Sequence, residues 1–174
     1  ALDVMFILDR SASMAEDNRW VAAANAINSA MESLLVGEEN AYNRVGITVF
    51  AGDADTSILP LNHYSKQGNT AFISNAYCGE SHNEYYGRFT LTTSTITKSV
   101  AMNSGYDDET GRSGTYTQMG IAAGIDELSD ASVPNDGLTH IPVVILLTDG
   151  EPNYYCSNTG NVTQNGRQDA GRYE

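Results

Sequence analysis

The sequence predicts an α/β fold: a mostly parallel, doubly wound sheet with one antiparallel edge strand and helices on both faces. Two observations lead to this fold class. Short apolar runs at residues 4–8, 44–50 and 141–147 are typical of strands that are buried on both faces. Amphipathic helical patterns separate these runs along the chain, and strands that alternate with helices form parallel sheets.

The first apolar run ends at Asp9, and a helical pattern follows it. Its apolar residues recur at intervals of three and four, at Trp20, Ala24, Ile27, Met31 and Leu34. We expect this helix to begin with Asp17 or Asn18 as its cap and to end near Gly37. Residues 44–50 form the next strand. Residues 56–61 contain Pro60, which suits an edge strand, and the short link before them favours an antiparallel hairpin.

Residues 63–90 form an irregular insert that is rich in Gly, Asn, Ser and Tyr, and so long a loop in a compact domain usually has a function. The pattern of residues 92–102 predicts a short helix. A second helix begins at Thr115, and its Gly120 and Gly124 let it approach the sheet closely. After the strand at residues 141–147 the chain is polar, with a faint helical tendency after Gln164.

Composition restricts the partners that this chain can have. Asp and Glu number 22 against 9 Lys and Arg, which gives a net charge of −13. Such a balance argues against binding to nucleic acids or to anionic membranes, and it suits the binding of cations. No apolar run approaches the roughly 20 residues of a membrane helix. We therefore expect neither nucleic acid nor membrane insertion.

Oxygen-bearing side chains converge at one edge of the expected sheet. Asp9, Ser11 and Ser13 follow the first strand, Asp149 follows the last, and Thr115 opens the helix before that last strand. Hard cations such as Mg²⁺ prefer oxygen ligands, whereas zinc prefers the His and Cys that this set lacks. Taken singly, the serines are equally explained as helix caps and Asp149 as the start of a turn.

Three segments in this order, DRSAS, SGTYT and LLTDG, resemble the metal-ion-dependent adhesion site of von Willebrand factor A domains, also called integrin I domains. The resemblance covers nearly the whole chain. It implies Mg²⁺ as the metal, with Mn²⁺ or Ca²⁺ as alternatives. Ser11, Ser13 and Thr115 would contact the metal directly, while Asp9 and Asp149 would act through water or through the hydroxyls. Thr117 is the alternative to Thr115, which we prefer because it is the first Thr of the pair.

The resemblance also implies a function outside catalysis. The chain is similar to bacterial surface and pilus-associated members, so we expect an extracellular, cell-surface adhesion module in a larger protein. Its partner would be a protein or matrix ligand that offers a Glu or Asp to the metal. Tyr77, Tyr85 and Tyr86 of the insert are candidate ligand contacts, although local packing explains them equally well.

Two further expectations depend on the same resemblance. Residues 1–174 are a single domain that lacks the C-terminal part of the family fold, which would leave the last apolar strand at an unpaired edge. Cys78 in the insert and Cys156 after Asp149 would both lie near the metal end. In an extracellular setting we expect a disulfide between them; in a cytosolic protein two free thiols are the ordinary state.

Two other functions compete with adhesion. An intracellular member of the family would act as a scaffold in a multiprotein complex. A metal-dependent hydrolase is disfavoured, because Ser11 stands where a phosphatase-like fold would need a second Asp as acid. His140 precedes its strand and so lies at the wrong end of the sheet for a catalytic triad. His63 and His82 lie in the insert, and we interpret them as surface residues. The sequence therefore predicts that this chain is not an enzyme.

Overall fold

The computed structural model describes most of the sheet and both long helices. The described residues are 1–51, 54–66, 68–69, 71–73, 88–92, 97–101, 115–150, 154–156, 162–164 and 167–169. The side chains at 12, 15–16, 54–58, 88–92, 97–101, 154–156, 162–164 and 167–169 are not described.

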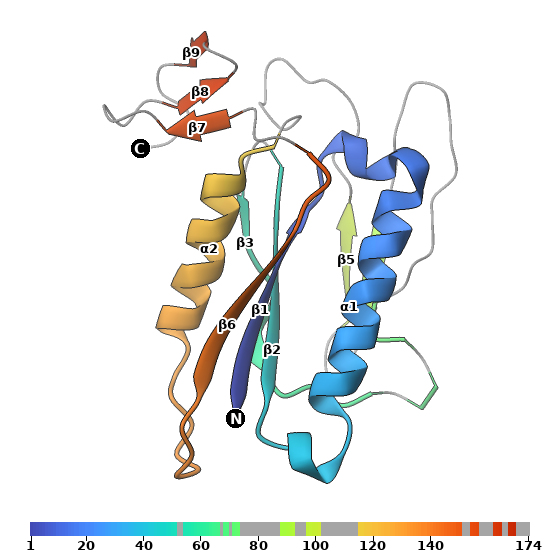
Figure 1. The fold of residues 1–174 in the computed structure, drawn as a ribbon, viewed down its shortest axis with the longest axis vertical. Coiled ribbons are helices and arrows are strands. Elements are labelled where there is room, and N and C mark those ends of the chain that lie inside the picture. The colour runs from blue at the N-terminus through green and yellow to red at the C-terminus, as the bar shows by residue number, and fades with distance from the viewer. Residues whose placement is uncertain are drawn as a thin grey trace.

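A four-stranded sheet forms the centre of the described chain (Figure 1), and its strand order is β3-β2-β1-β6. The strands are β1 (Leu2–Asp9), β2 (Arg44–Phe50), β3 (Ala54–Asn62) and β6 (Ile141–Leu147). Strand β1 pairs in parallel with both β2 and β6, and β3 pairs antiparallel with β2. This arrangement confirms the predicted fold class and the antiparallel hairpin. Among the described strands, β6 pairs with β1 alone, as expected for an edge.

Helices cover both faces of this sheet, with α1 (Arg19–Leu35) on one side and α2 (Thr117–Asp130) on the other (Figure 1). A 3-10 helix, η1 (Ala12–Asn18), precedes α1, and a second one, η2 (Glu38–Asn40), follows it. The expected side-chain cap is wrong: Asn18 has a φ of 58° and makes no capping hydrogen bond. Instead, η1 continues directly into α1 at Arg19.

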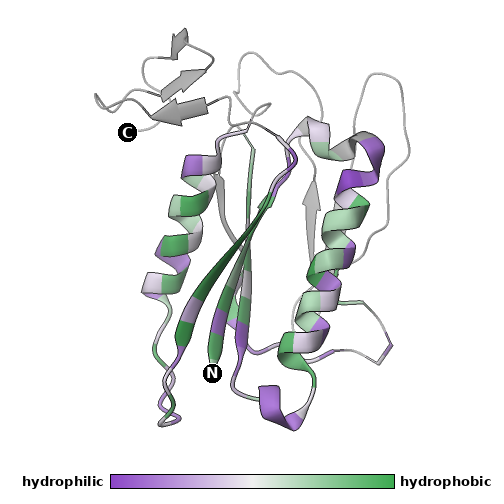
Figure 2. Cartoon of the chain, viewed as in Figure 1, coloured by the Kyte–Doolittle hydropathy of each residue, from purple (hydrophilic) through white to green (hydrophobic). Residues whose placement is uncertain are grey.

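Strand β1 is buried on both faces, as predicted. Val4, Phe6 and Leu8 belong to the apolar cluster that includes the inner face of α1. Met5 and Ile7 alternate with them and point toward α2, as expected from the period of two in a strand. Hydrophobic residues accordingly follow the central strands in Figure 2, while hydrophilic residues gather at the loops below them.

Helix α2 approaches the sheet closely because two of its residues are glycines. A Cβ placed on Gly120 would lie 2.5 Å from Cδ1 of Phe50, and one on Gly124 would lie 2.5 Å from Cδ1 of Ile7. Real Cβ atoms do not come so near to another carbon, so alanine at either position would force the helix or the facing side chain to shift. The close approach predicted from the glycine spacing is therefore confirmed.

Two small sheets correct the secondary structure predicted for irregular parts of the chain. Strand β5 (Thr97–Ala101) lies where we predicted a helix at residues 92–102, and it pairs antiparallel with β4 (Arg88–Thr92). That stretch is rich in Thr, Ile and Val, whose branched β-carbons favour strands. Strands β7 (Tyr154–Cys156), β8 (Val162–Gln164) and β9 (Arg167–Asp169) form a second antiparallel sheet, so the helical tendency after Gln164 is also wrong.

The first part of the insert packs against the core. Tyr64, Phe72 and Ile73 are buried in the apolar cluster beneath α1. The side chain of Asn28 holds the backbone of Ile73 by two hydrogen bonds, both 2.7 Å long. These aromatic and apolar residues are therefore structural. Tyr77, Cys78, His82, Tyr85 and Tyr86 lie outside the described residues.

No helix in the described part of the chain combines the length and apolarity that a membrane span requires.

Candidate metal centre

The site begins where two neighbouring strands end. Strands β1 and β6 pair in parallel, and Leu8 lies opposite Leu147. The residues that follow, Asp9 on one strand and Thr148 with Asp149 after the other, therefore leave the sheet side by side. The prediction that the carboxylates of Asp9 and Asp149 meet at one edge is consistent with this register.

A chain of hydrogen bonds connects the two carboxylates through the serines. The backbone N–H of Ser11 donates to Oδ1 of Asp9 over 2.7 Å. The Oγ atoms of Ser11 and Ser13 are 3.1 Å apart, and Oγ of Ser13 donates to Oδ1 of Asp149 over 3.0 Å. The two serines therefore lie between the two carboxylates, with hydroxyl oxygens directed into the same small space.

Asp9 is fully buried beneath this hydroxyl chain. Burial raises the pKa of its carboxyl above the ordinary value, against the lowering effect of hydrogen bonds from Ser11 and Thr148. The negative charge of Asp149 raises the pKa further. A buried carboxylate beside a second carboxylate is poorly compensated by its own protein, so a cation placed nearby would stabilise the charged form of both.

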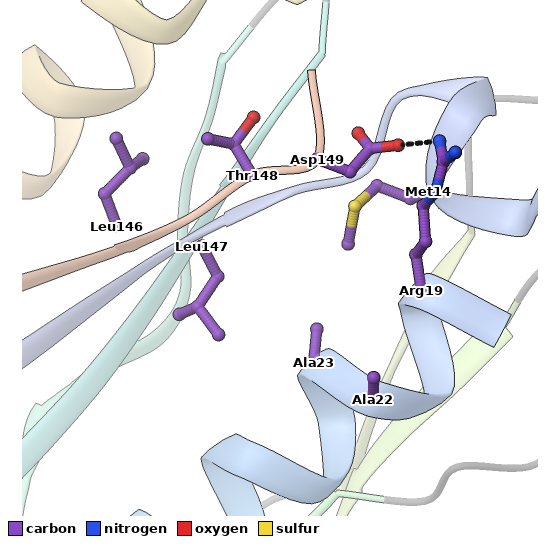
Figure 3. A pocket seen from close by; sticks show the side chains of 8 residues that line it. All are labelled: Met14, Arg19, Ala22, Ala23, Leu146, Leu147, Thr148 and Asp149. Atoms are coloured by element: carbon purple, nitrogen blue, oxygen red, sulfur yellow. Dashed lines mark hydrogen bonds and ion pairs between the residues drawn. The ribbon is translucent and has the colours of Figure 1, made fainter. Parts of the chain in front are cut away.

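One cation already approaches this centre. Nη1 of Arg19 lies 2.6 Å from Oδ2 of Asp149 and donates to the backbone carbonyl of Ser13 over 3.3 Å. Figure 3 shows the guanidinium directed at the carboxylate of Asp149, at the rim of a hollow between α1 and β6. The hollow has a volume of about 380 Å³, and Met14 and Leu147 are among its apolar lining residues.

Thr115 lies beside the turn that carries Asp149. A Cβ on Gly150 would be 3.6 Å from Oγ1 of Thr115, and the side chain of Thr115 is buried. The backbone N–H of Tyr116 donates to the carbonyl of Ala51 over 2.6 Å, which fixes this segment to the end of β2. The structure therefore brings Thr115 to the edge of the sheet where Asp149 lies.

The rival residue, Thr117, is the first residue of α2. Its Oγ1 is buried and has no hydrogen-bond partner among the described residues. A buried hydroxyl without a partner is itself unusual. The preference for Thr115 over Thr117 stays a prediction.

The chemistry of these donors fits a hard cation. All of the side-chain donors are oxygens, two from carboxylates and three from hydroxyls, which suits Mg²⁺. In the part of the chain that the structure describes, no three His, Cys, Asp or Glu residues gather as a metal-binding group. This is consistent with the proposed donors, because three of the five residues are Ser or Thr.

Sequence reasoning missed two residues of this site. Thr148 donates its hydroxyl to Oδ2 of Asp9 over 2.7 Å, and it was visible as the Thr before Asp149 in LLTDG. Arg19 was interpreted only as part of the helical pattern, because nothing in the local sequence connects it with Asp149, 130 positions later. The predicted disulfide is untested, because Cys78 lies outside the described residues and only the backbone of Cys156, in β7, is described.

The fold is that of a von Willebrand factor type A domain, and comparison with known families agrees. The family model of that name matches residues 4–100, more than half of the chain, so the chain belongs to this family. The search of curated proteins gave no match.

Among solved structures, the pilus adhesin RrgA from Streptococcus pneumoniae is similar to this chain, with 17% sequence identity and a TM-score of 0.49. The match covers 88% of this chain and 21% of the adhesin, so the chain spans about a fifth of that protein's length.

Proposed function

We propose that this chain is an extracellular, metal-dependent adhesion module that binds a carboxylate of a protein or matrix ligand. The observation that carries the proposal is the continuous series of oxygens from Asp9 through Ser11 and Ser13 to Asp149. Such a series, buried at one end and partly accessible at the other, is suited to holding one small cation at the surface of the domain.

The neutral and the charged residues of this site would have different roles. Ser11, Ser13 and Thr115 would hold the metal with neutral hydroxyl oxygens, and Asp9 and Asp149 would orient those hydroxyls by hydrogen bonds or act through water. The bound metal would supply a Lewis-acidic position that an outside Glu or Asp can occupy. Because neutral ligands leave much of the metal's charge uncompensated, that position favours an anionic partner.

Histidine placement supports a binding function over hydrolysis. His140 lies before β6, at the end of the sheet opposite Ser11 and Ser13 as predicted, where its ring contacts Asp3 and Asp136. Nδ1 of His63 lies 2.9 Å from the backbone carbonyl of Asn43. Neither ring is paired with Ser11 or Ser13, so among the described residues these hydroxyls have no histidine base of the kind a catalytic triad uses.

The first test is titration of Mg²⁺, Mn²⁺ and Ca²⁺ into the chelator-treated protein by calorimetry. We expect one divalent cation per chain, and we expect Asp9→Ala and Ser13→Ala to weaken its binding at least about a hundredfold. Asp126→Ala is the matched control, because Asp126 is an exposed carboxylate on α2. Circular dichroism confirms that each variant is folded.

The second test is adhesion of the labelled protein to immobilised matrix proteins with and without chelator. Binding that disappears with chelator and with Ser13→Ala, but persists with Asp126→Ala, would support the proposal. Wild-type protein that binds no divalent cation, or adhesion that survives chelator, would contradict it.

A further inference from the structure

Both oxygens of Asp149 are already in use in this structure. Oδ1 accepts a hydrogen bond from Ser13, and Oδ2 lies 2.6 Å from Nη1 of Arg19. The Asp149 side chain is only 8% exposed, so this ion pair is largely removed from water on the carboxylate side. A charge-assisted contact of this length is among the stronger hydrogen bonds in proteins.

The same guanidinium also reaches the serine segment, through the carbonyl of Ser13. Arg19 therefore contacts two of the residues proposed to surround the metal, and it neutralises one of the two carboxylates that would attract it. A divalent cation and a guanidinium so close together repel each other. The two cations are consequently alternatives at Asp149.

We propose that Arg19 is a displaceable internal counter-cation that competes with the metal for Asp149 and thereby sets the metal affinity of the site. This inference rests on the proposed metal-binding function. It adds a residue outside the oxygen donors to the determinants of affinity, and it gives the metal-free domain a means of holding its two carboxylates together.

A second carboxylate makes the displacement feasible. Nη2 of Arg19 lies 3.3 Å from Oδ2 of Asp17, whose side chain is 82% exposed. The Arg19 side chain is itself 36% exposed and belongs to the first residue of α1. The guanidinium can therefore leave Asp149 for water and Asp17 without being buried unpaired, and an exposed pair of this kind holds it only weakly.

Two opposite effects follow from this competition. Without metal, the Arg19–Asp149 pair stabilises the fold, because it compensates a carboxylate next to the buried Asp9. With metal, the guanidinium has lost that partner and adds only repulsion. Removing Arg19 should therefore weaken the metal-free domain and strengthen the metal-bound one, whereas a purely structural arginine would weaken both.

The experiment compares wild type with Arg19→Gln, Arg19→Lys and the control Lys66→Gln. The control removes one positive charge from the pair that Lys66 forms with Glu32, outside the site. We expect Arg19→Gln to bind Mg²⁺ about fivefold more tightly by calorimetry, the upper end of the range for one partly exposed ion pair. Arg19→Lys should fall between Arg19→Gln and wild type, because it keeps the charge but loses the planar fork. Lys66→Gln should bind as wild type does.

Thermal unfolding provides the second readout. In chelator we expect Arg19→Gln to melt below wild type, and in saturating Mg²⁺ we expect the difference to vanish or reverse. If wild type binds Mg²⁺ but Arg19→Gln binds it no more tightly, or melts lower in both conditions, the competition is overturned while the metal site stands. If neither protein binds a divalent cation, the proposed function fails first.

Discussion

The two ends of strand β1 hold the same kind of side chain in opposite electrostatic surroundings. At its start, Asp3 accepts hydrogen bonds from Nε and Nη2 of Arg44, 2.8 and 2.6 Å away, and lies 2.9 Å from Nδ1 of His140. At its end, Asp9 is bonded to Ser11 and Thr148, and its neighbouring carboxylate is Asp149.

The pKa values shift in opposite directions at these two ends. Burial raises the pKa of Asp3, but hydrogen bonds from Arg44 and His140 outweigh it and hold that pKa below its ordinary value. Burial also raises the pKa of Asp9, where hydroxyl and amide donors do not outweigh it. The first end has its cations built in and is structural. At the second end, the partly exposed Arg19 pairs with Asp149 rather than with Asp9, and such a weakly compensated pair of carboxylates would suit the proposed metal.

The start of β1, where Arg44 and His140 compensate Asp3, is here called the balanced end. Disrupting it should have the largest effect on stability. We expect Arg44→Met to lower the free energy of unfolding by about 3 kcal/mol, because it leaves the nearly buried carboxylate of Asp3 with less compensation. Urea unfolding in chelator measures this loss. Lys66→Met is the matched control, since its pair with Glu32 is more exposed and should contribute less than about 1 kcal/mol.

The same variant also tests how separate the two ends are. Mg²⁺ affinity should be unchanged in Arg44→Met, because its partners Asp3 and Ser132 do not belong to the proposed metal site. A large loss of metal affinity in a folded Arg44→Met protein would show that the two ends are coupled.

The end of β1, where Asp9 lies beside Asp149, is the unbalanced end. There, the loss of one hydroxyl should have a smaller effect, on metal affinity. We expect Thr148→Val to weaken Mg²⁺ binding about tenfold, because Oδ2 of Asp9 loses its donor and the carboxylate is no longer held in place. Valine keeps the shape of the side chain, so calorimetry reports the hydroxyl alone. The control is Thr139→Val, an exposed threonine at the balanced end. Equal affinities of Thr148→Val and wild type would mean that Asp9 does not need this support.

Local sequence patterns predicted the elements that carry the site. The apolar runs of β1, β2 and β6 and the repeat of three and four in α1 are visible within a few residues, because burial on one or two faces fixes the periodicity. The serines and carboxylates were found for the same reason, since each lies directly after a strand. The short helix at residues 92–102 was wrong because β-branched residues outweighed a weak helical pattern.

The partners of charged residues could not be predicted in the same way. Asp3 and Arg44 are 41 positions apart, and Asp3 and His140 are 137 apart. Parallel pairing of β1 with both β2 and β6 is what brings them together, and that register is a property of the whole sheet. Arg19 is similar, because its distance from Asp149 follows from the packing of α1 against the sheet. Sequence predicted that these oxygens lie together at one edge of the sheet, but it did not predict that Arg19 contacts them.

The smallest expected effect on stability concerns His140. Because His140 lies at the balanced end, its contribution should depend on pH. Hydrogen bonds to Asp136 and Asp3 raise the pKa of its ring above the ordinary value of 6.5. The charged ring, which also faces Arg44 across Asp3, is therefore favoured in the folded state. Its stabilisation is fully present below about pH 6.5 and is lost as the pH rises through the folded-state pKa.

We accordingly expect His140→Asn to be less stable than wild type in mildly acidic solution, and the difference to shrink as the pH rises. Urea unfolding in chelator across this pH range measures it, and titration of Asp9 cancels in the comparison because both proteins keep that residue. His63→Asn is the control, since its ring contacts the carbonyl of Asn43 rather than a carboxylate. A stability difference that is constant with pH would mean that His140 acts at the balanced end through packing, without contributing its charge.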